Sequence, residues 1–166
     1  WGSYRVHYPR FLYMLPKKYF YHVSGNSAQK RVTNYVEETF ETPHDVVQTC
    51  GFYLDGYATL RYCREHDIPL VALSHAGDLQ NFDRFNDTVQ SQIRETIDYC
   101  SAVLTVSDEL ADVARRFAPA SKVTTLPIGE DPDKYPTDRR EAIRRELGID
   151  PDTKLLLFVG RFEKEK

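Results

Sequence analysis

The stretch at residues 68–79 constrains the fold of this chain more than any other part of the sequence. It holds an apolar run at residues 70–73 that ends abruptly in a polar turn with His75, Gly77 and Asp78. Short apolar runs bounded by breaking residues are typical of buried strands, and buried strands flanked by helices belong to parallel sheets. Ligands bind such sheets just beyond the carboxyl ends of the strands. The turn is therefore the first candidate for a functional site.

The rest of the chain alternates between strand patterns and helix patterns. Further strands are expected at residues 44–49, 102–106 and 122–126, and helices at residues 26–40, 55–66, 87–99 and 107–117. Asp87 and Ser107 are expected to cap the last two of these helices. Gly25 and the two early prolines are expected to interrupt any long element before residue 26. This alternation predicts an α/β fold with a Rossmann-like, doubly wound parallel sheet of right-handed βαβ units.

The composition changes after residue 128. An Asp- and Pro-rich connection, a charged helix closed by Gly148, and a buried strand are expected at residues 130–136, 138–147 and 155–159. We therefore expect one Rossmann-like domain over residues 1–128 and the start of a second, truncated domain over residues 129–166. Because the chain begins with Trp1 and stops just after a predicted strand, we expect it to be a piece of a longer protein.

Charge is unevenly distributed along the chain, whose formal net charge is −3. Residues 1–36 contain six lysines and arginines and no acid, and residues 1–25 interleave these cations with tyrosines and phenylalanines. Amphipathic aromatic side chains beside cations suit a peripheral membrane contact or an anionic, lipid-linked acceptor. The alternative is a loop that covers the core. The sequence gives no reason to expect a nucleic-acid partner.

The sequence also bears on the cellular compartment. The longest uninterrupted apolar run, at residues 155–159, has five residues, which is too short for a transmembrane helix, and no secretion signal is visible. The three cysteines, Cys50, Cys63 and Cys100, are widely spaced and fit neither a metal knuckle nor a redox pair. We expect buried thiols in a reducing, cytoplasmic compartment.

Several short motifs follow one another in an order that is known from one enzyme family. They are His-Asp-Val-Val and Tyr-Leu-Asp-Gly-Tyr at residues 44–47 and 53–57, Ser-His-Ala-Gly-Asp-Leu at 74–79, Ala-Val-Leu-Thr-Val-Ser at 102–107, Leu-Pro-Ile-Gly at 126–129 with Asp131, and Leu-Phe-Val-Gly-Arg at 157–161 with Lys166. By their order and spacing the chain resembles the family 4 glycosyltransferases (group 1 relatives) of the GT-B type, over roughly residues 40–166.

The resemblance implies an activity. Such enzymes move a sugar from a nucleotide sugar to a glycan or lipid-linked acceptor with retention of anomeric configuration, usually without a metal or another cofactor. It also implies that residues 1–128 belong to the acceptor-side domain and residues 129–166 to the donor-binding domain. Most of the donor site would then lie beyond residue 166, including a pair of glutamates, so we expect residues 1–166 alone to be inactive.

The resemblance assigns His75, Gly77 and Asp78 to the cleft near the donor sugar. An imidazole there can bond to a sugar hydroxyl and orient the ring, glycine permits a close backbone approach, and a carboxylate can accept a hydroxyl. The alternatives are a histidine that bonds to a loop carbonyl and an aspartate that holds its own loop through an Asx-type turn. Ala76 stands where glycine or a small polar residue is common in the family, which is a mild departure.

Gly160, Arg161 and Lys166 match the pattern that opens the donor domain. Cations aimed at a pyrophosphate leaving group would stabilise the charge that gathers on it as the glycosidic bond breaks. The alternative is that these cations are solvated surface residues. Ile128 replaces an asparagine that is common in the family, so no role is assigned to that position.

Two other classes of function remain open from the sequence. One is a nucleotide-cofactor oxidoreductase domain, which also uses a parallel sheet, although no Gly-x-Gly-x-x-Gly follows a predicted strand. The other is a non-catalytic Rossmann-like binding domain. Residues beyond 166 would separate the latter from an active transferase.

Overall fold

The computed structural model describes residues 5–15, 17–134 and 138–160 of the chain. The chain divides into two compact units, Trp1–Ile128 and Gly129–Lys166, which are described separately. Whether these units serve an acceptor and a donor stays a prediction.

A four-stranded parallel sheet forms the centre of the first unit. Its strands are β1 (Val47–Thr49), β2 (Leu70–Ser74), β3 (Ala102–Thr105) and β4 (Val123–Thr125). They lie in the order β1-β2-β3-β4, and each pairs in parallel with the next. Sequential order with right-handed crossovers places the connecting helices on one face, as in one half of a doubly wound sheet. The α/β Rossmann-like fold class predicted from the sequence is confirmed.

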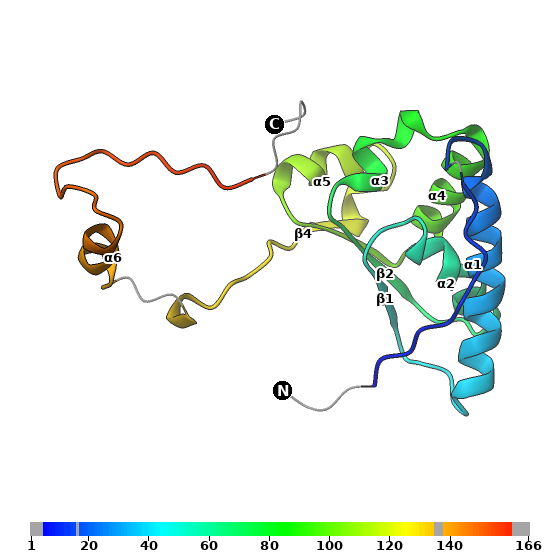
Figure 1. The fold of residues 1–166 in the computed structure, drawn as a ribbon. Helices are drawn as coiled ribbons and strands as arrows, with labels where there is room; N and C mark the ends of the chain where they lie inside the picture. The colour runs from blue at the N-terminus through cyan, green and yellow to red at the C-terminus, as the bar shows by residue number, and fades with distance from the viewer. Residues whose placement is uncertain (1–4, 16, 135–137, 161–166) are drawn as a thin grey trace. The chain divides into compact units, whose positions relative to one another are not determined.

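The helices of this unit follow the strands in alternation. They are α1 (Lys17–Thr39), α2 (Asp55–Glu65), the short α3 (Gly77–Gln80), α4 (Asp87–Tyr99) and α5 (Asp108–Ala114), with 3-10 turns at Phe82–Arg84 and Ala120–Lys122. Figure 1 shows α1, α2 and α4 packed together on one side of the strands. In the part of the chain that the structure describes, none of the helices has the length and apolar character needed to cross a membrane.

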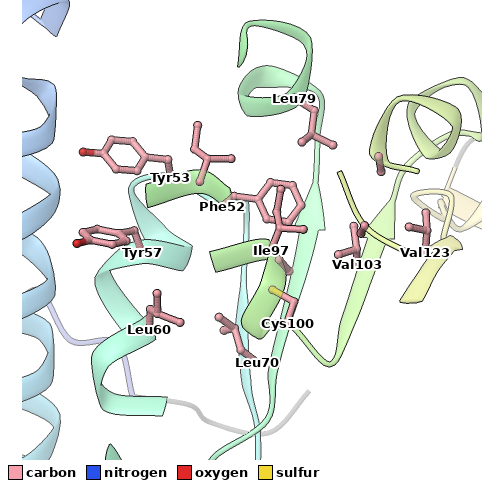
Figure 2. Packing of buried hydrophobic residues seen from close by; sticks show 14 of the residues in the cluster. Phe52, Tyr53, Tyr57, Leu60, Leu70, Leu79, Ile97, Cys100, Val103 and Val123 are labelled. Atoms are coloured by element: carbon pink, nitrogen blue, oxygen red, sulfur yellow. The ribbon is translucent and has the colours of Figure 1, made fainter. Parts of the chain in front are cut away.

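The core lies between these helices and one face of the sheet. Leu70, Ala72 and Ser74 of β2 are buried, whereas Val71 and Leu73, which point to the other face, are only partly buried. Figure 2 shows Phe52 of the β1–α2 turn and Ile97 of α4 pointing toward the strands, whereas Tyr53 points toward α1. Burial of such large apolar side chains is the main favourable term in folding. Within the described residues, therefore, the helices cover one face of the sheet.

Helix α1 begins earlier than the sequence predicts, because Gly25 does not interrupt it. Gly25 is buried inside the helix, and a Cβ at this position would lie only 2.8 Å from Cζ of Tyr53. The Tyr53 hydroxyl donates a hydrogen bond of 2.7 Å to the carbonyl of Tyr21 on the same helix. Glycine costs a helix interior up to about 1 kcal/mol relative to alanine. Close packing against the Tyr53 ring offsets that cost.

Of the two helix caps predicted from the sequence, the one at Ser107 is confirmed and the one at Asp87 is wrong. Ser107 caps α5, since its side chain accepts a hydrogen bond of 3.2 Å from the amide of Leu110. Asp87, however, is the first residue of α4, and the preceding Asn86 caps this helix through a 3.0 Å bond from the amide of Val89. Asparagine and aspartate are equally good caps, so the sequence alone does not choose between the neighbours.

In the second unit the predicted charged helix is present, but the predicted strand at residues 155–159 is not. This unit contains a 3-10 turn (Pro132–Lys134) and α6 (Arg140–Glu146), and Gly148, just beyond the C-cap of α6, has a φ of +67° in the left-handed region. Residues 155–159 form no strand, and Leu156 is 97% exposed, so the predicted buried strand is wrong for the structure as described. A strand needs a neighbour for its backbone groups, and no described strand pairs with these residues.

We expect Gly25→Ala to lower the free energy of unfolding by roughly 1–3 kcal/mol, because the new methyl group would overlap the Tyr53 ring. This sign opposes the usual gain from replacing a helical glycine with alanine. Urea denaturation measures the change. The double variant Gly25→Ala/Tyr53→Phe should recover part of the loss, and a Gly25→Ala protein as stable as the parent would contradict the packing argument.

Candidate functional site

The polar turn after β2 lies at the carboxyl edge of the sheet, as predicted. His75 is exposed immediately beyond Ser74, the last residue of β2. The predicted loop that follows is largely helical, since it contains α3 and the turn at Phe82–Arg84. His75 is thus held between a rigid strand and a helix, with its imidazole accessible to a ligand.

Backbone strain marks the residue next to His75. Ala76 has φ of +103° and ψ of −47°, a conformation that side chains with a Cβ rarely adopt. Residues in such regions cost of order 1–3 kcal/mol and persist only where the surrounding structure holds them. Glycine, one of the residues that the resemblance led us to expect at this position, would adopt this φ without the strain.

Asp78 supplies the contact that holds the turn. Its Oδ2 accepts hydrogen bonds from the backbone amides of Phe52, at 2.7 Å, and Tyr53, at 3.0 Å. Both amides belong to the turn between β1 and α2, so the carboxylate ties two adjacent turns at the carboxyl edge together. The sequence offered the alternative that Asp78 holds its own loop, but the loop it holds is the neighbouring one. We call this contact the Asp78 brace.

Gly51 makes room for the Asp78 brace. Its φ is +126°, and a Cβ built on it would lie 2.9 Å from Oδ2 of Asp78. Both the backbone conformation and the space therefore require glycine. Burial raises the pKa of the Asp78 carboxyl, the amide bonds from Tyr53 and Phe52 lower it, and the nearby Asp55 raises it slightly, with a net upward shift.

Buried hydroxyl groups end the strands at the same edge. Thr49 donates a bond of 3.0 Å to the carbonyl of Gly51, and Thr105 donates one of 3.2 Å to the carbonyl of Ser107. Each hydroxyl satisfies a backbone group of the turn that follows its own strand, which a buried turn requires. The turns after β1 and β3 are thereby fixed by the strands that precede them.

Gly77 has open space around it. It is exposed at the start of α3, and a Cβ built on it would meet no atom within 4 Å in the described part of the chain. The described fold therefore does not itself require glycine there. Close approach of a ligand, the role that the resemblance implies for Gly77, stays a prediction.

The residues predicted for the donor side belong to the second unit of the chain. Gly160 is exposed at the end of the described part of the second unit, and Arg161 and Lys166 lie outside the described residues. The structure thus brings together His75, Gly77 and Asp78, with Gly51 and the amides of Phe52 and Tyr53 as partners that sequence reasoning missed. The glycine in Cys-Gly-Phe at residues 50–52 was the available signal, since it directly follows a predicted strand.

No metal site is evident in the same region. Among residues 5–15, 17–134 and 138–160, no group of three His, Cys, Asp or Glu side chains could hold a metal ion. The expectation of a reaction without a metal stays a prediction.

These features place the chain in a broad class of protein, the Rossmann-like α/β proteins. Parallel strands that end in polar turns at one edge form the Rossmann-like arrangement that binds nucleotide-containing ligands. Sequence comparison narrows this class. The model of glycosyltransferase family 4 matches residues 3–134. The chain belongs to glycosyltransferase family 4.

Curated relatives carry the names of glycosyltransferases. A D-inositol 3-phosphate glycosyltransferase of Corynebacterium aurimucosum is 31% identical over 139 residues, which cover 76% of this chain and 33% of the relative. The enzyme of the same name from Thermobifida fusca is 32% identical over 133 residues, covering 74% and 30%. TuaC of Bacillus subtilis, named for teichuronic acid biosynthesis, is 28% identical over 101 residues, covering 60% and 26%. The chain spans between 26% and 33% of the length of these relatives.

We expect Ala76→Gly to raise the free energy of unfolding by about 1 kcal/mol, because relief of the positive φ exceeds the added flexibility of the unfolded chain. Urea denaturation measures the change. Ala58→Gly in α2 is the matched control and should lose stability, as glycine does in a helix interior. Equal losses in both variants would show that Ala76 is not strained.

Proposed function

We propose that the protein is a retaining glycosyltransferase that moves a sugar from a nucleotide sugar to a glycan or lipid-linked acceptor. Membership of glycosyltransferase family 4 supports glycosyl transfer in general. The observation that carries the proposal for this chain is the exposed imidazole of His75, placed at the carboxyl edge of the sheet by the strained Ala76 and the Asp78 brace. A backbone held in this way presents the imidazole at a defined place to a substrate, which favours orientation of the reacting groups.

We assign the sugar-orienting role to His75. Its ring nitrogens can donate to or accept from a sugar hydroxyl and hold the donor ring for departure of the nucleotide. Oδ1 of Asp78, which accepts no hydrogen bond within the described residues, is free to accept a hydroxyl of a sugar while Oδ2 serves the Asp78 brace.

We assign the leaving group to the second unit. Gly160 would let the pyrophosphate approach the backbone, and Arg161 and Lys166 would neutralise the charge that develops on it. Two cations aimed at the pyrophosphate supply the electrostatic stabilisation that a divalent metal supplies in other transferases, so we propose that no metal is required.

We propose an anionic acceptor on the basis of the relatives. Two of them are named for D-inositol 3-phosphate and one for teichuronic acid, and both names denote anions. We further propose a cytoplasmic location with peripheral membrane contact through residues 1–25. Three free thiols, two of them buried, suit a reducing compartment.

The alternatives are separated by a direct assay. The family assignment favours transfer over a nucleotide-cofactor oxidoreductase. A non-catalytic binding domain would bind a nucleotide sugar without turnover. A screen of nucleotide sugars against the intact protein, with release of nucleoside diphosphate as the signal, decides between turnover and binding alone.

We expect His75→Ala to lower kcat by roughly 10- to 100-fold, because the sugar would lose the hydrogen bond that orients it for the reaction. The Kd for the nucleotide should stay unchanged, because His75 is assigned to the sugar. Steady-state kinetics and nucleotide titration of the intact enzyme measure the two effects. His66→Ala, at the end of α2 where His66 pairs with Glu37, is the matched control and should be fully active. Wild-type turnover by His75→Ala would remove His75 from the catalytic assignment.

We expect Gly77→Ala to leave the free energy of unfolding unchanged, because the new methyl group meets no atom of the described fold. The same substitution should raise the KM for a substrate that approaches this backbone, because the methyl group would obstruct it. Gly129→Ala is the matched control, because a Cβ at Gly129 also meets no atom within 4 Å in the described structure. Urea denaturation and steady-state kinetics separate the two effects. A Gly77→Ala enzyme with the parent KM values would show that no substrate approaches this backbone.

A further inference from the structure

An extended segment at residues 5–15 lies along α1. The amide of Leu12 donates a bond of 2.9 Å to Oγ of Ser27, and the amide of Met14 donates one of 2.8 Å to Oγ of Ser24. Nδ1 of His7 lies 2.8 Å from the Tyr35 hydroxyl. The segment therefore runs antiparallel to the helix, and Figure 1 shows this dark blue stretch beside α1. We call residues 5–15 the strap.

A pocket of about 320 Å³ lies between the strap and α1. Arg10 of the strap and Lys30 and Arg31 of α1 contribute cations to its lining, and Ser27 and Asn34 contribute polar groups. No acid within the described residues forms an ion pair with these three cations. Residues 5–36 contain no aspartate or glutamate at all. The pocket therefore presents an uncompensated positive field to an anion.

Large apolar side chains on the strap and on the first turns of α1 are exposed, and Leu12 among them lines this pocket. The exposed fractions are 84% for Tyr8, 57% for Leu12, 68% for Leu15, 59% for Tyr19 and 42% for Phe20. Exposed apolar surface of this extent beside cations marks an interaction site. Tyrosine and phenylalanine, with lysine and arginine nearby, suit the boundary between lipid headgroups and acyl chains.

Charge decides which occupant fits best. A neutral protein surface could cover the aromatic side chains, but it would remove three unpaired cations from water without compensation, which is unfavourable. A layer of anionic phospholipid pairs the cations with phosphates and accepts the aromatic rings at the same depth.

We propose that the surface formed by the strap and α1 docks on an anionic phospholipid layer, with a lipid phosphate held by Arg10, Lys30 and Arg31. This inference deepens the peripheral membrane contact of the proposed function and rests on it. The docking surface is distinct in residues from the group around His75, so binding to a membrane and sugar transfer can be measured separately.

Sedimentation of the intact protein with sucrose-loaded vesicles tests the proposal. Vesicles of phosphatidylcholine with phosphatidylglycerol should bind the protein, and vesicles of phosphatidylcholine alone should not. The variant Arg10→Gln/Lys30→Gln/Arg31→Gln should bind the anionic vesicles roughly 100-fold more weakly, at about fivefold for each cation near an anionic surface. Arg139→Gln/Arg140→Gln/Arg145→Gln removes the same charge from the second unit and should bind like the parent.

Two further measurements separate the sources of the anion and the two functions. Inorganic phosphate at matched ionic strength should not displace the protein from vesicles if the lipid layer is the ligand, whereas displacement would identify a site for free phosphate and overturn the proposal. Turnover with a water-soluble acceptor should be unchanged in the variant Arg10→Gln/Lys30→Gln/Arg31→Gln. Loss of membrane binding is then distinguishable from loss of sugar transfer. Equal binding of the parent and of the Arg10→Gln/Lys30→Gln/Arg31→Gln variant to anionic vesicles, or no binding of the intact protein to them, would also overturn the proposal.

Discussion

The carboxylate of Asp78 is the contact on which the candidate site depends. It joins the turn after β2 to the turn after β1 through the amides of Phe52 and Tyr53. The turn after β2 is also held by its own residues, since the Asn81 side chain donates a hydrogen bond to the carbonyl of Gly77, but the bonds to Asp78 join this turn to its neighbour. The site is therefore organised by a partly buried carboxylate that need not itself react, as preorganised sites generally require.

Much of the fold follows from local patterns, and the exceptions have common causes. Helix α4 and the cap at Ser107 follow from periodicity and capping chemistry within a few residues. Helix α1 continues through Gly25 because Tyr53, far along the chain, packs against this glycine. Residues 155–159 form no strand because no described strand pairs with them. Local propensity is a weak prior that tertiary contacts override.

The location of the candidate site could be predicted from the sequence, but the contacts that hold its turns together could not. The end of β2 follows from the sequence because parallel sheets collect ligands there. The Asp78 brace joins residues 26 and 25 positions apart, and no local pattern encodes such a pairing. The positive φ of Ala76 was likewise hidden, since alanine gives no signal of it. Gly51 alone carried a trace of the arrangement, as a glycine directly beyond a strand.

The hydrogen bonds that hold the turns at the strand ends have a consequence for how the protein can change over evolutionary time. Thr105 holds the turn after β3 together with Ser107, which caps α5, and with Thr125 of β4, whose hydroxyl donates a hydrogen bond to Asp108. The turns after β1 and β2 are coupled through Asp78 and must change together. A substitution in either of the first two turns would therefore alter the other as well, so their sequences depend on each other.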